Sequence, residues 1–478
     1  MPKKFLSNVL LLLAVNLLIK PFWILGIDRT VQNTVGNEAY GAYINLFTLS
    51  LLFSMLLDFG INNYTSTFIA RHKHMLDKKF AALLPLKLLF SGAYLIATLG
   101  FGLLYGYKGF GLLLLFCLGI NQVMAFFILF FRANISGLQL FRTDSFLSVT
   151  DRGMMIIFAL LLFFVLKGNF RVEHFIMAQS AGYLASLCIS FFVLKKHLNF
   201  TSLTFNKVMM FSIIRQAWPY ALLALLMTVY TRTDYLLIKK ILPDGDLQNG
   251  IYAVANRLFE AANMMAVLVA TMLLPLFANM IKKGEDLTAL IKICMVLLLI
   301  PAVTIAALSW NYAFEIIGML SKNNPLASAQ VFPFVMLSFV AMCVMYIFGT
   351  LLTAGANLKI LNYLAAIAIA INLVLNLVLI PKMGAKGAAI TAVCTHGFIA
   401  LSNAFFAVKR HAIRLNTTFV AAFSFILLSV VALVTVCRLW AVPLPVSAGL
   451  SVVYVIVLLF ATRLINIRQL TQLGKHTA

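Results

Sequence analysis

The chain has 478 residues, of which 63 % are hydrophobic and only 11 % are charged. Its mean hydropathy of +1.00 lies well outside the range of soluble domains, in which about half of the residues are apolar. This composition excludes a soluble enzyme and predicts an all-α integral membrane protein with one membrane domain. The net charge of +23 does not indicate nucleic-acid binding, because the basic residues stand in small groups between apolar segments.

Apolar runs of about 18 residues or more predict about fourteen membrane-spanning helices. They are expected near residues 5–27, 39–66, 80–106, 109–135, 146–166, 172–194, 215–240, 250–280, 287–309, 328–354, 359–380, 386–408, 417–437 and 443–463. Lys20 and Pro21 interrupt the first run and no small-residue cleavage pattern precedes them, so the run is predicted to be an uncleaved first helix.

The connections between the predicted helices are short, and basic residues gather in alternate ones. Arg71, Lys73, Lys78 and Lys79 share one such loop. Because cytoplasmic loops retain positive charge during insertion, this loop and both termini are predicted to be cytoplasmic. The same basic groups are expected to attract anionic membrane lipids.

A faint internal repeat relates the two halves of the chain. The residues YGAY at 40–43 precede the second span and NGIY at 249–252 precede the eighth, at an offset of 209. Two sets of six helices plus two extra helices would account for fourteen spans. The predicted organisation is therefore a six-helix lobe at 1–200, a second at 201–410, and an additional helix pair with a tail at 411–478, with a central cavity between the lobes.

Several charged residues fall inside the predicted spans. A charge facing lipid at the bilayer centre costs about 2.5 to 3.5 kcal/mol, so most of these residues must pair, reach the interface or face a wet cavity. Lys87 and Lys292 lie near helix ends and are expected to snorkel. The remaining charges are Lys20, Asp58, Asp151, Arg152, Arg232, Asp234, Arg257 and Glu260.

Polar residues in some of these spans recur at helical spacing. Ser54, Asp58, Asn62 and Thr65 would form one stripe on the second helix, and Asn256, Glu260 and Asn263 would form another beside Arg257. Asn16, Lys20 and Trp23 form a shorter stripe on the first helix, where Pro21 is expected to kink or interrupt the chain. Such stripes are either interhelical hydrogen-bonding contacts or the wall of a polar cavity.

A cavity lined by these residues would be cationic. Its candidate substrate-binding cations are Lys20, Arg152, Arg232 and Arg257, and guanidinium groups match phosphate oxygens, so an anionic substrate is predicted. Asp58, Asp234 and Glu260 are candidates either for balancing these charges or for taking H+ or Na+ that couples transport. The sequence leaves both roles open.

The sequence contains no pattern for covalent catalysis, metal binding or a cofactor. No HExxH, GxSxG or paired-carboxylate motif is present, and no GxxxxGK[ST] phosphate loop occurs. The six cysteines lie in or beside apolar runs without CxxC spacing and are interpreted as small core residues. A transporter without cofactor or metal is therefore predicted, rather than an enzyme.

Five short segments resemble the polysaccharide flippases of the multidrug/oligosaccharidyl-lipid/polysaccharide exporter superfamily. They are NTVGNEAYGAY at 33–43, DFGIN at 58–62, RTDYLL at 232–237, GIYAVANR at 250–257 and NLVLNLVLIPKMGAKGAA at 372–389. Their order and spacing extend over most of the membrane core. At Lys20 the sequence departs from many relatives, which have arginine there.

The resemblance implies two six-helix lobes that open alternately to each side of a bacterial inner membrane. The implied substrate is an undecaprenyl-pyrophosphate-linked oligosaccharide, held through its pyrophosphate by Lys20, Arg232 and Arg257. A monomer is expected. The alternatives are a flippase for a cell-wall lipid precursor, a multidrug exporter of the same superfamily, and, from a different class, a membrane glycan polymerase, ligase or glycosyltransferase.

Overall fold

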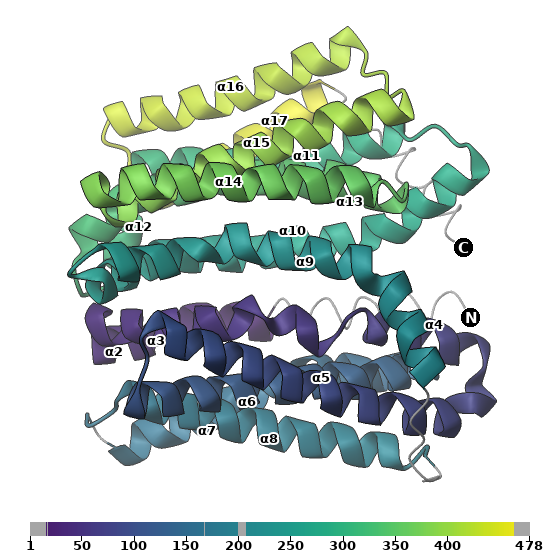
Figure 1. Ribbon diagram of the computed structural model, residues 1–478. Coiled ribbons are helices and arrows are strands. Elements are labelled where there is room, and N and C mark those ends of the chain that lie inside the picture. Colours follow the sequence, from purple (N-terminus) through teal and green to yellow (C-terminus); the bar gives the residue numbers. More distant parts are fainter. Residues whose placement is uncertain (1–15, 17, 167, 199–206, 463–478) are drawn as a thin grey trace. The chain divides into compact units, whose positions relative to one another are not determined.

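The computed structural model describes residues 16, 18–166, 168–198 and 207–462, and all regular secondary structure in this part of the chain is helical (Figure 1). The chain divides into two compact units, Met1–Gly250 and Ile251–Ala478. The first unit contains η1 (Trp23–Asp28), α2 (Arg29–Val35), α3 (Asn37–Leu52), η2 (Ser54–Leu57), α4 (Ile61–Arg71), η3 (Lys73–Met75), α5 (Leu76–Tyr105), α6 (Gly109–Gly137), α7 (Phe141–Leu166), α8 (Val172–Lys195), α9 (Lys207–Ile241) and the start of α10 (Gly245–Lys283).

The second unit contains the rest of α10 and seven further helices. These are α11 (Thr288–Asn311), α12 (Ala313–Leu320), α13 (Pro325–Ala354), α14 (Leu358–Met383), α15 (Ala385–His411), α16 (Thr417–Leu439) and α17 (Leu444–Ala461). The helices α13 and α15 pack closely against each other, while α11 packs on α13 and α14 packs on α15. The predicted division into lobes at 1–200 and 201–410 stays a prediction.

Twelve helices in the described residues are long and apolar enough to cross a membrane. They are the twelve spans predicted from residue 80 onward, so this part of the helical pattern is confirmed. The first predicted span lies largely outside the described residues. The second lacks a continuous helix of the required length, so twelve of the fourteen predicted spans are confirmed in the described residues.

The predicted continuous helix over 39–66 is wrong, because the chain breaks in its middle. The helix α3 ends at Leu52, a 3₁₀ turn covers Ser54–Leu57, and α4 begins only at Ile61. Phe59 and Gly60 have φ angles of 42° and 76°, which lie in the left-handed region that a regular helix does not use. The supposed polar stripe from Ser54 to Thr65 therefore does not lie along one helical face.

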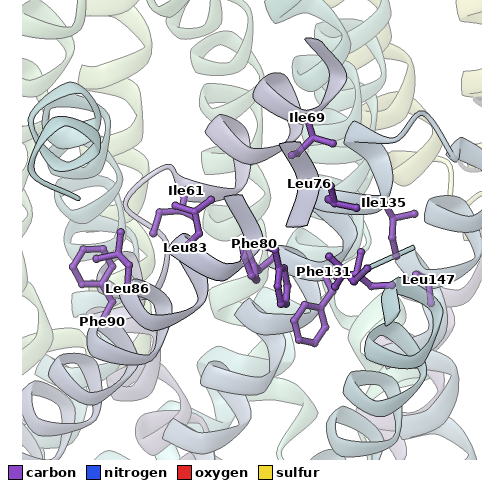
Figure 2. Packing of buried hydrophobic residues seen from close by; sticks show 13 residues of the cluster. Ile61, Ile69, Leu76, Phe80, Leu83, Leu86, Phe90, Phe131, Ile135 and Leu147 are labelled. Carbon is purple, nitrogen blue, oxygen red and sulfur yellow. The ribbon is translucent and has the colours of Figure 1, made fainter. Parts of the chain in front are cut away.

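An apolar core holds the broken helix to its neighbours in the first unit. Ten of its thirteen buried residues come from α4, α5 and α6, the other three come from α7, from α8 and from just after α8, and several of the thirteen are aromatic (Figure 2). Phe80 stacks on Phe130 with ring centroids 5.6 Å apart, and Phe59 packs against Phe90 at 4.9 Å. Burial of a large apolar side chain contributes about 1.5 to 3 kcal/mol, so this core is expected to hold its helices together firmly.

The C-terminal helix pair packs on α11. The aromatic ring of Tyr312, at the junction of α11 and α12, is buried with Ala307 and Val434 of α16. Its hydroxyl donates a hydrogen bond of 2.9 Å to the carbonyl oxygen of Val442, in the turn between α16 and α17. The pair is thus attached to the second unit through both apolar and polar contacts.

The predicted topology can be tested at the turn between α4 and α5. His74 is exposed there, and Asp244 is exposed in the turn between α9 and α10, which is predicted to lie on the opposite side. We expect His74→Cys to react with a membrane-impermeant maleimide only after cells are permeabilised, and Asp244→Cys to react in intact cells. The parent chain provides the background from its own cysteines. Labelling of His74→Cys in intact cells would reverse the assigned orientation.

Candidate functional site

The first helix carries a lysine that the described residues leave without a bonded partner. Lys20 lies in a helical stretch that runs without interruption through Pro21 into the π-helical turn η1. The kink expected at Pro21 thus takes the form of a widened turn rather than a break. The Lys20 side chain is half-buried and forms no hydrogen bond or ion pair with the residues that the structure describes.

Three charged residues of α6 and α7 act on Lys20 and form with it the Lys20 cluster. Asp151 attracts the ammonium group, whereas Arg152 and Arg132 repel it. The carboxylate Oδ2 of Asp151 lies 3.8 Å from Nε of Arg152, and its Oδ1 is buried without a hydrogen-bond partner in the described part of the chain. Asp151 is thus only loosely engaged by its neighbour.

The cations of the Lys20 cluster differ in how well they are satisfied. Nε of Arg132 donates a hydrogen bond of 2.8 Å to Oδ1 of Asp144, and this ion pair balances the charge of Arg132. The guanidinium of Arg152 lies 3.8 Å from Asp151 and 3.5 Å from the sulfur of Met155, which are both weak contacts. It also interacts with the hydroxyl of the buried Tyr183. About a quarter of the Arg152 side chain, 28 %, remains exposed. The cluster therefore offers an ammonium and part of a guanidinium to an incoming anion.

Aromatic side chains fix this part of the first helix against α8. Trp23 stacks on Phe175 with ring centroids 5.6 Å apart, and the Arg152 guanidinium lies 5.7 Å from the Trp23 ring. Nε2 of Gln179 donates a hydrogen bond of 2.8 Å to the hydroxyl of Tyr43, which itself packs edge-on against Phe175. These contacts hold Arg152 in place through cation–π attraction and restrict its rotamers.

Nearer the end of the same helix, a second carboxylate is bound by a tyrosine. The hydroxyl of Tyr40 lies 2.9 Å from both oxygens of Asp28. Asp28 also acts electrostatically on Arg152 and Tyr43, so it belongs to the surroundings of the Lys20 cluster. On the other side of Lys20, Asn16 donates a hydrogen bond of 2.8 Å to Ser148 of α7, which keeps the first helix beside α7.

Asp58 and Lys87 meet at the break of the second predicted span. Nζ of Lys87 donates to Oδ1 of Asp58 at 3.1 Å and to the carbonyl oxygen of Leu57 at 2.8 Å. The same Oδ1 accepts a hydrogen bond of 3.1 Å from the backbone N–H of Asn62. Lys87 is 1 % exposed, so the prediction that it snorkels to the interface is wrong: its ammonium satisfies a free carbonyl and a carboxylate inside the protein.

The other membrane lysine, Lys292, is engaged near the start of its helix. Nζ of Lys292 donates a hydrogen bond of 2.9 Å to Oδ1 of Asn416, just before the start of α16. It also lies 5.2 Å from the ring centroid of Phe419. Its hydrogen bond is exposed, in contrast to those of Lys87.

The four predicted site residues of α9 and α10 lie within long helices. Asp234 is 2 % exposed and Arg257 is 3 % exposed, whereas Arg232 and Glu260 are partly buried. All four have interaction partners in the protein. The grouping of Lys20, Arg232 and Arg257 around one substrate stays a prediction.

Reasoning from periodicity missed several residues that surround Lys20. Arg132, Asp144 and Asp28 pair across helices or with an aromatic hydroxyl, and no single helix face contains them together. One signal was present for Arg132, a cation inside the apolar run 109–135. Among the described residues, no group of three or more His, Cys, Asp or Glu side chains could hold a metal ion. The cysteines are free thiols.

The sequence profile of a family described as "Polysaccharide biosynthesis protein" matches residues 5–281. No functionally curated protein sequence matches the chain. The matched residues include the whole Lys20 cluster, the broken second span and the charged residues of α9 and α10.

Solved membrane transporters share the fold. The chain is similar to a structure described as "Lipid II flippase MurJ, inward closed conformation", with a TM-score of 0.71, 16 % identity, and coverage of 97 % of this chain and 100 % of that one. An inward-facing multidrug resistance MATE family transporter of the MOP superfamily gives a TM-score of 0.59 at 13 % identity, covering 83 % of this chain and 94 % of that one. A point mutant of the Vibrio cholerae MATE transporter VcmN gives 0.51 at 11 % identity, covering 84 % and 97 %. At these identities the likeness establishes the fold alone.

Proposed function

The chain belongs to the polysaccharide biosynthesis protein family, a family of membrane transporters rather than enzymes, and on this basis we propose that it moves an undecaprenyl-pyrophosphate-linked oligosaccharide across a bacterial inner membrane. The proposed cargo is a repeat unit of a surface polysaccharide. Both termini would be cytoplasmic, and the monomer would be the working unit. Transport would proceed by alternating access, with the substrate site exposed first to one side and then to the other.

The observation that carries this proposal is the state of Lys20. A charge held within a membrane span without a bonded partner costs several kcal/mol unless water or a ligand satisfies it. The Lys20 ammonium has three donors and forms no hydrogen bond with the residues that the structure describes, while the ion pair of the nearby Arg152 with Asp151 is long, at 3.8 Å. An anionic head group such as a pyrophosphate supplies several acceptor oxygens and would satisfy both.

The proposed cations all fall at depths within the hydrocarbon core. At about 1.5 Å per residue, Lys20 lies about 22 Å from Val35 and Arg152 about 21 Å from Leu166, at the helix ends predicted to face outward. By the same rise, Arg232 lies about 14 Å from Ile241 and Arg257 about 18 Å from Gly245. In a hydrocarbon core about 30 Å thick, Arg232 and Arg257 would lie near the middle, whereas Lys20 and Arg152 would lie about 8 to 9 Å from the inner boundary. The four cations form the proposed substrate-binding set.

The acidic residues are assigned to charge balance and ion coupling. Asp58 balances Lys87 at 3.1 Å. Asp234 and Glu260 are the proposed sites at which uptake of H+ or Na+ would compensate the charge of the bound head group. The proposal further assigns residues 1–200 and 201–410 to the two alternating six-helix halves, and residues 411–478 to additional helices.

Reconstitution into liposomes would test the proposed function. We expect the protein to translocate a fluorescent lipid-pyrophosphate oligosaccharide, and to leave an uncharged lipid-linked oligosaccharide behind, because only the former offers phosphate oxygens to the cations. A lipid-linked peptidoglycan precursor is the second substrate to compare, because the fold resembles that of a lipid II flippase. Preferential movement of the precursor would redirect the assignment to a cell-wall flippase, and movement of cationic drugs alone would assign a multidrug exporter.

A further inference from the structure

Two glycines at matching positions of the internal repeat lie against each other in the first unit. Gly41 is in the first turns of α3 and Gly250 in the first turns of α10, and they are 209 residues apart, as the repeat requires. A Cβ atom added to Gly41 would lie 1.8 Å from the carbonyl oxygen of Asp246. One added to Gly250 would lie 2.0 Å from the carbonyl oxygen of Asn37.

The contact is reciprocal. Asn37 precedes Gly41 by four residues, and Asp246 precedes Gly250 by four, so each glycine touches the carbonyl one turn before the other. The residue numbers 37 and 246 also differ by 209. The faint sequence repeat is thus realised as a local two-fold contact in which both backbones approach more closely than any side chain allows.

Buried and partly buried hydrogen bonds surround the contact of Gly41 and Gly250, which we call the glycine seal. Nδ2 of Asn45 and Nδ2 of Asn249 each donate to the carbonyl oxygen of Tyr235, at 3.0 Å. Nε2 of Gln32 donates at 2.8 Å to the carbonyl oxygen of Gly250. The hydroxyl of Tyr107 donates at 2.7 Å to Oδ1 of Asn45. The beginning of α3 and the turn from α9 to α10 are therefore joined by polar and backbone contacts.

This type of contact suits repeated opening. A hydrogen bond within the protein contributes only a small net stabilisation, because water replaces the lost partner when it breaks. Water cannot compensate in the same way for opening the apolar core around α4, α5 and α6, because its separation would expose large aromatic surfaces to water. The two helices that meet at the glycine seal can therefore separate with only a small loss of free energy.

From this geometry we infer that the glycine seal is a gate that closes the membrane face opposite the Arg71 to Lys79 turn, and that it opens and closes once per transport cycle. Gly41 lies in the first turns of α3, and the chain runs through the rest of α3, η2 and α4 before it reaches that turn, so the two lie toward opposite ends of the broken span. The role of the gate in a transport cycle rests on the proposed function. Its existence as an opening contact is independent of the substrate.

Substitution of one glycine should hold the gate open. Gly41→Ala introduces a methyl group at a point only 1.8 Å from a backbone oxygen, so the helices must move apart. With spin labels at Glu38→Cys and Asp244→Cys, both exposed, we expect Gly41→Ala and Gly250→Ala to shift the distance distribution measured by pulsed electron resonance to longer values. Gly92→Ala is the matched control, because a Cβ there meets nothing within 4 Å. An unchanged distribution in folded Gly41→Ala protein would overturn the gate.

Locking the gate shut provides a measurement that does not depend on the folding of a glycine variant. A bis-methanethiosulfonate linker that joins Glu38→Cys to Asp244→Cys should stop translocation, and dithiothreitol should restore it. Undiminished translocation in the cross-linked protein would show that this contact does not open during transport. Because the spin-label distances require no substrate, failure of the gate and failure of the proposed cargo give different results.

Discussion

Replacing Lys87 by alanine should lower the free energy of unfolding by about 3 to 5 kcal/mol, which is the usual loss when one partner of a buried ion pair is removed. The ammonium of Lys87 is 1 % exposed and is the donor for both Asp58 and the carbonyl oxygen of Leu57. Without it, the carbonyl at the end of η2 and the carboxylate just before α4 lose their shared partner. Denaturant unfolding of the purified protein in detergent would measure the effect.

A double-mutant cycle would separate the ion pair from simple packing. Asp58→Asn retains an oxygen that can accept from the backbone N–H of Asn62, but leaves Lys87 without a counter-charge. We expect Lys87→Met combined with Asp58→Asn to be more stable than the sum of the single losses predicts, because the second change removes the uncompensated charge. Lys292→Ala is the control, since its hydrogen bond with Asn416 is exposed. Additive losses would mean that the two charges do not stabilise the break as a pair.

The break itself shows where reasoning from sequence stops. Apolar runs predicted twelve of the spans because length and hydropathy are properties of a single helix. The spacing of Ser54, Asp58 and Asn62 fitted a helical period equally well, although the chain leaves the helix between them. The available signal was DFG at 58–60: an aspartate that can cap a new helix, followed by a glycine that tolerates a positive φ.

The candidate site was predictable only in part. The sequence singled out Lys20 and Arg152 because they are charges in apolar runs. It could not distinguish a loosely held cation from a satisfied one, because the partners come from other elements: Asp144 for Arg132, and Leu57 and Asp58 for Lys87. The repeat of glycines was visible in the sequence, but the contact of each with the other's helix depends on tertiary packing.

Lys20 and Lys87 are both lysines within the membrane, and the second prediction rests on their contrast. Lys20 forms no hydrogen bond or ion pair with the described residues, so Lys20→Ala should not lower the free energy of unfolding. If its ammonium binds a phosphate oxygen of the substrate, removal should cost about 1.5 to 3 kcal/mol of binding, the range for a hydrogen bond to a charged group. This corresponds to a rise in Kd of about 10- to 150-fold.

Equilibrium binding of a lipid-pyrophosphate analogue to purified protein would measure this rise, at equal folded concentration and fixed salt. Lys292→Ala should bind like the parent chain, because Lys292 is engaged with Asn416 near a helix end. Equal affinities of Lys20→Ala and the parent chain would remove Lys20 from the site and leave Arg152, Arg232 and Arg257 as its candidates.

Lys20→Arg tests whether the residue contacts the head group directly. A guanidinium can donate two parallel hydrogen bonds to adjacent phosphate oxygens, whereas an ammonium acts as a point charge. Because the Lys20 side chain is half-buried and not committed to a partner in the described residues, the larger group can adjust its rotamer toward the ligand. Lys20→Arg should therefore keep or increase the affinity that Lys20→Ala loses. If Lys20→Arg lost as much affinity as Lys20→Ala, the position would tolerate only the size of lysine, and its charge would not be what the substrate contacts.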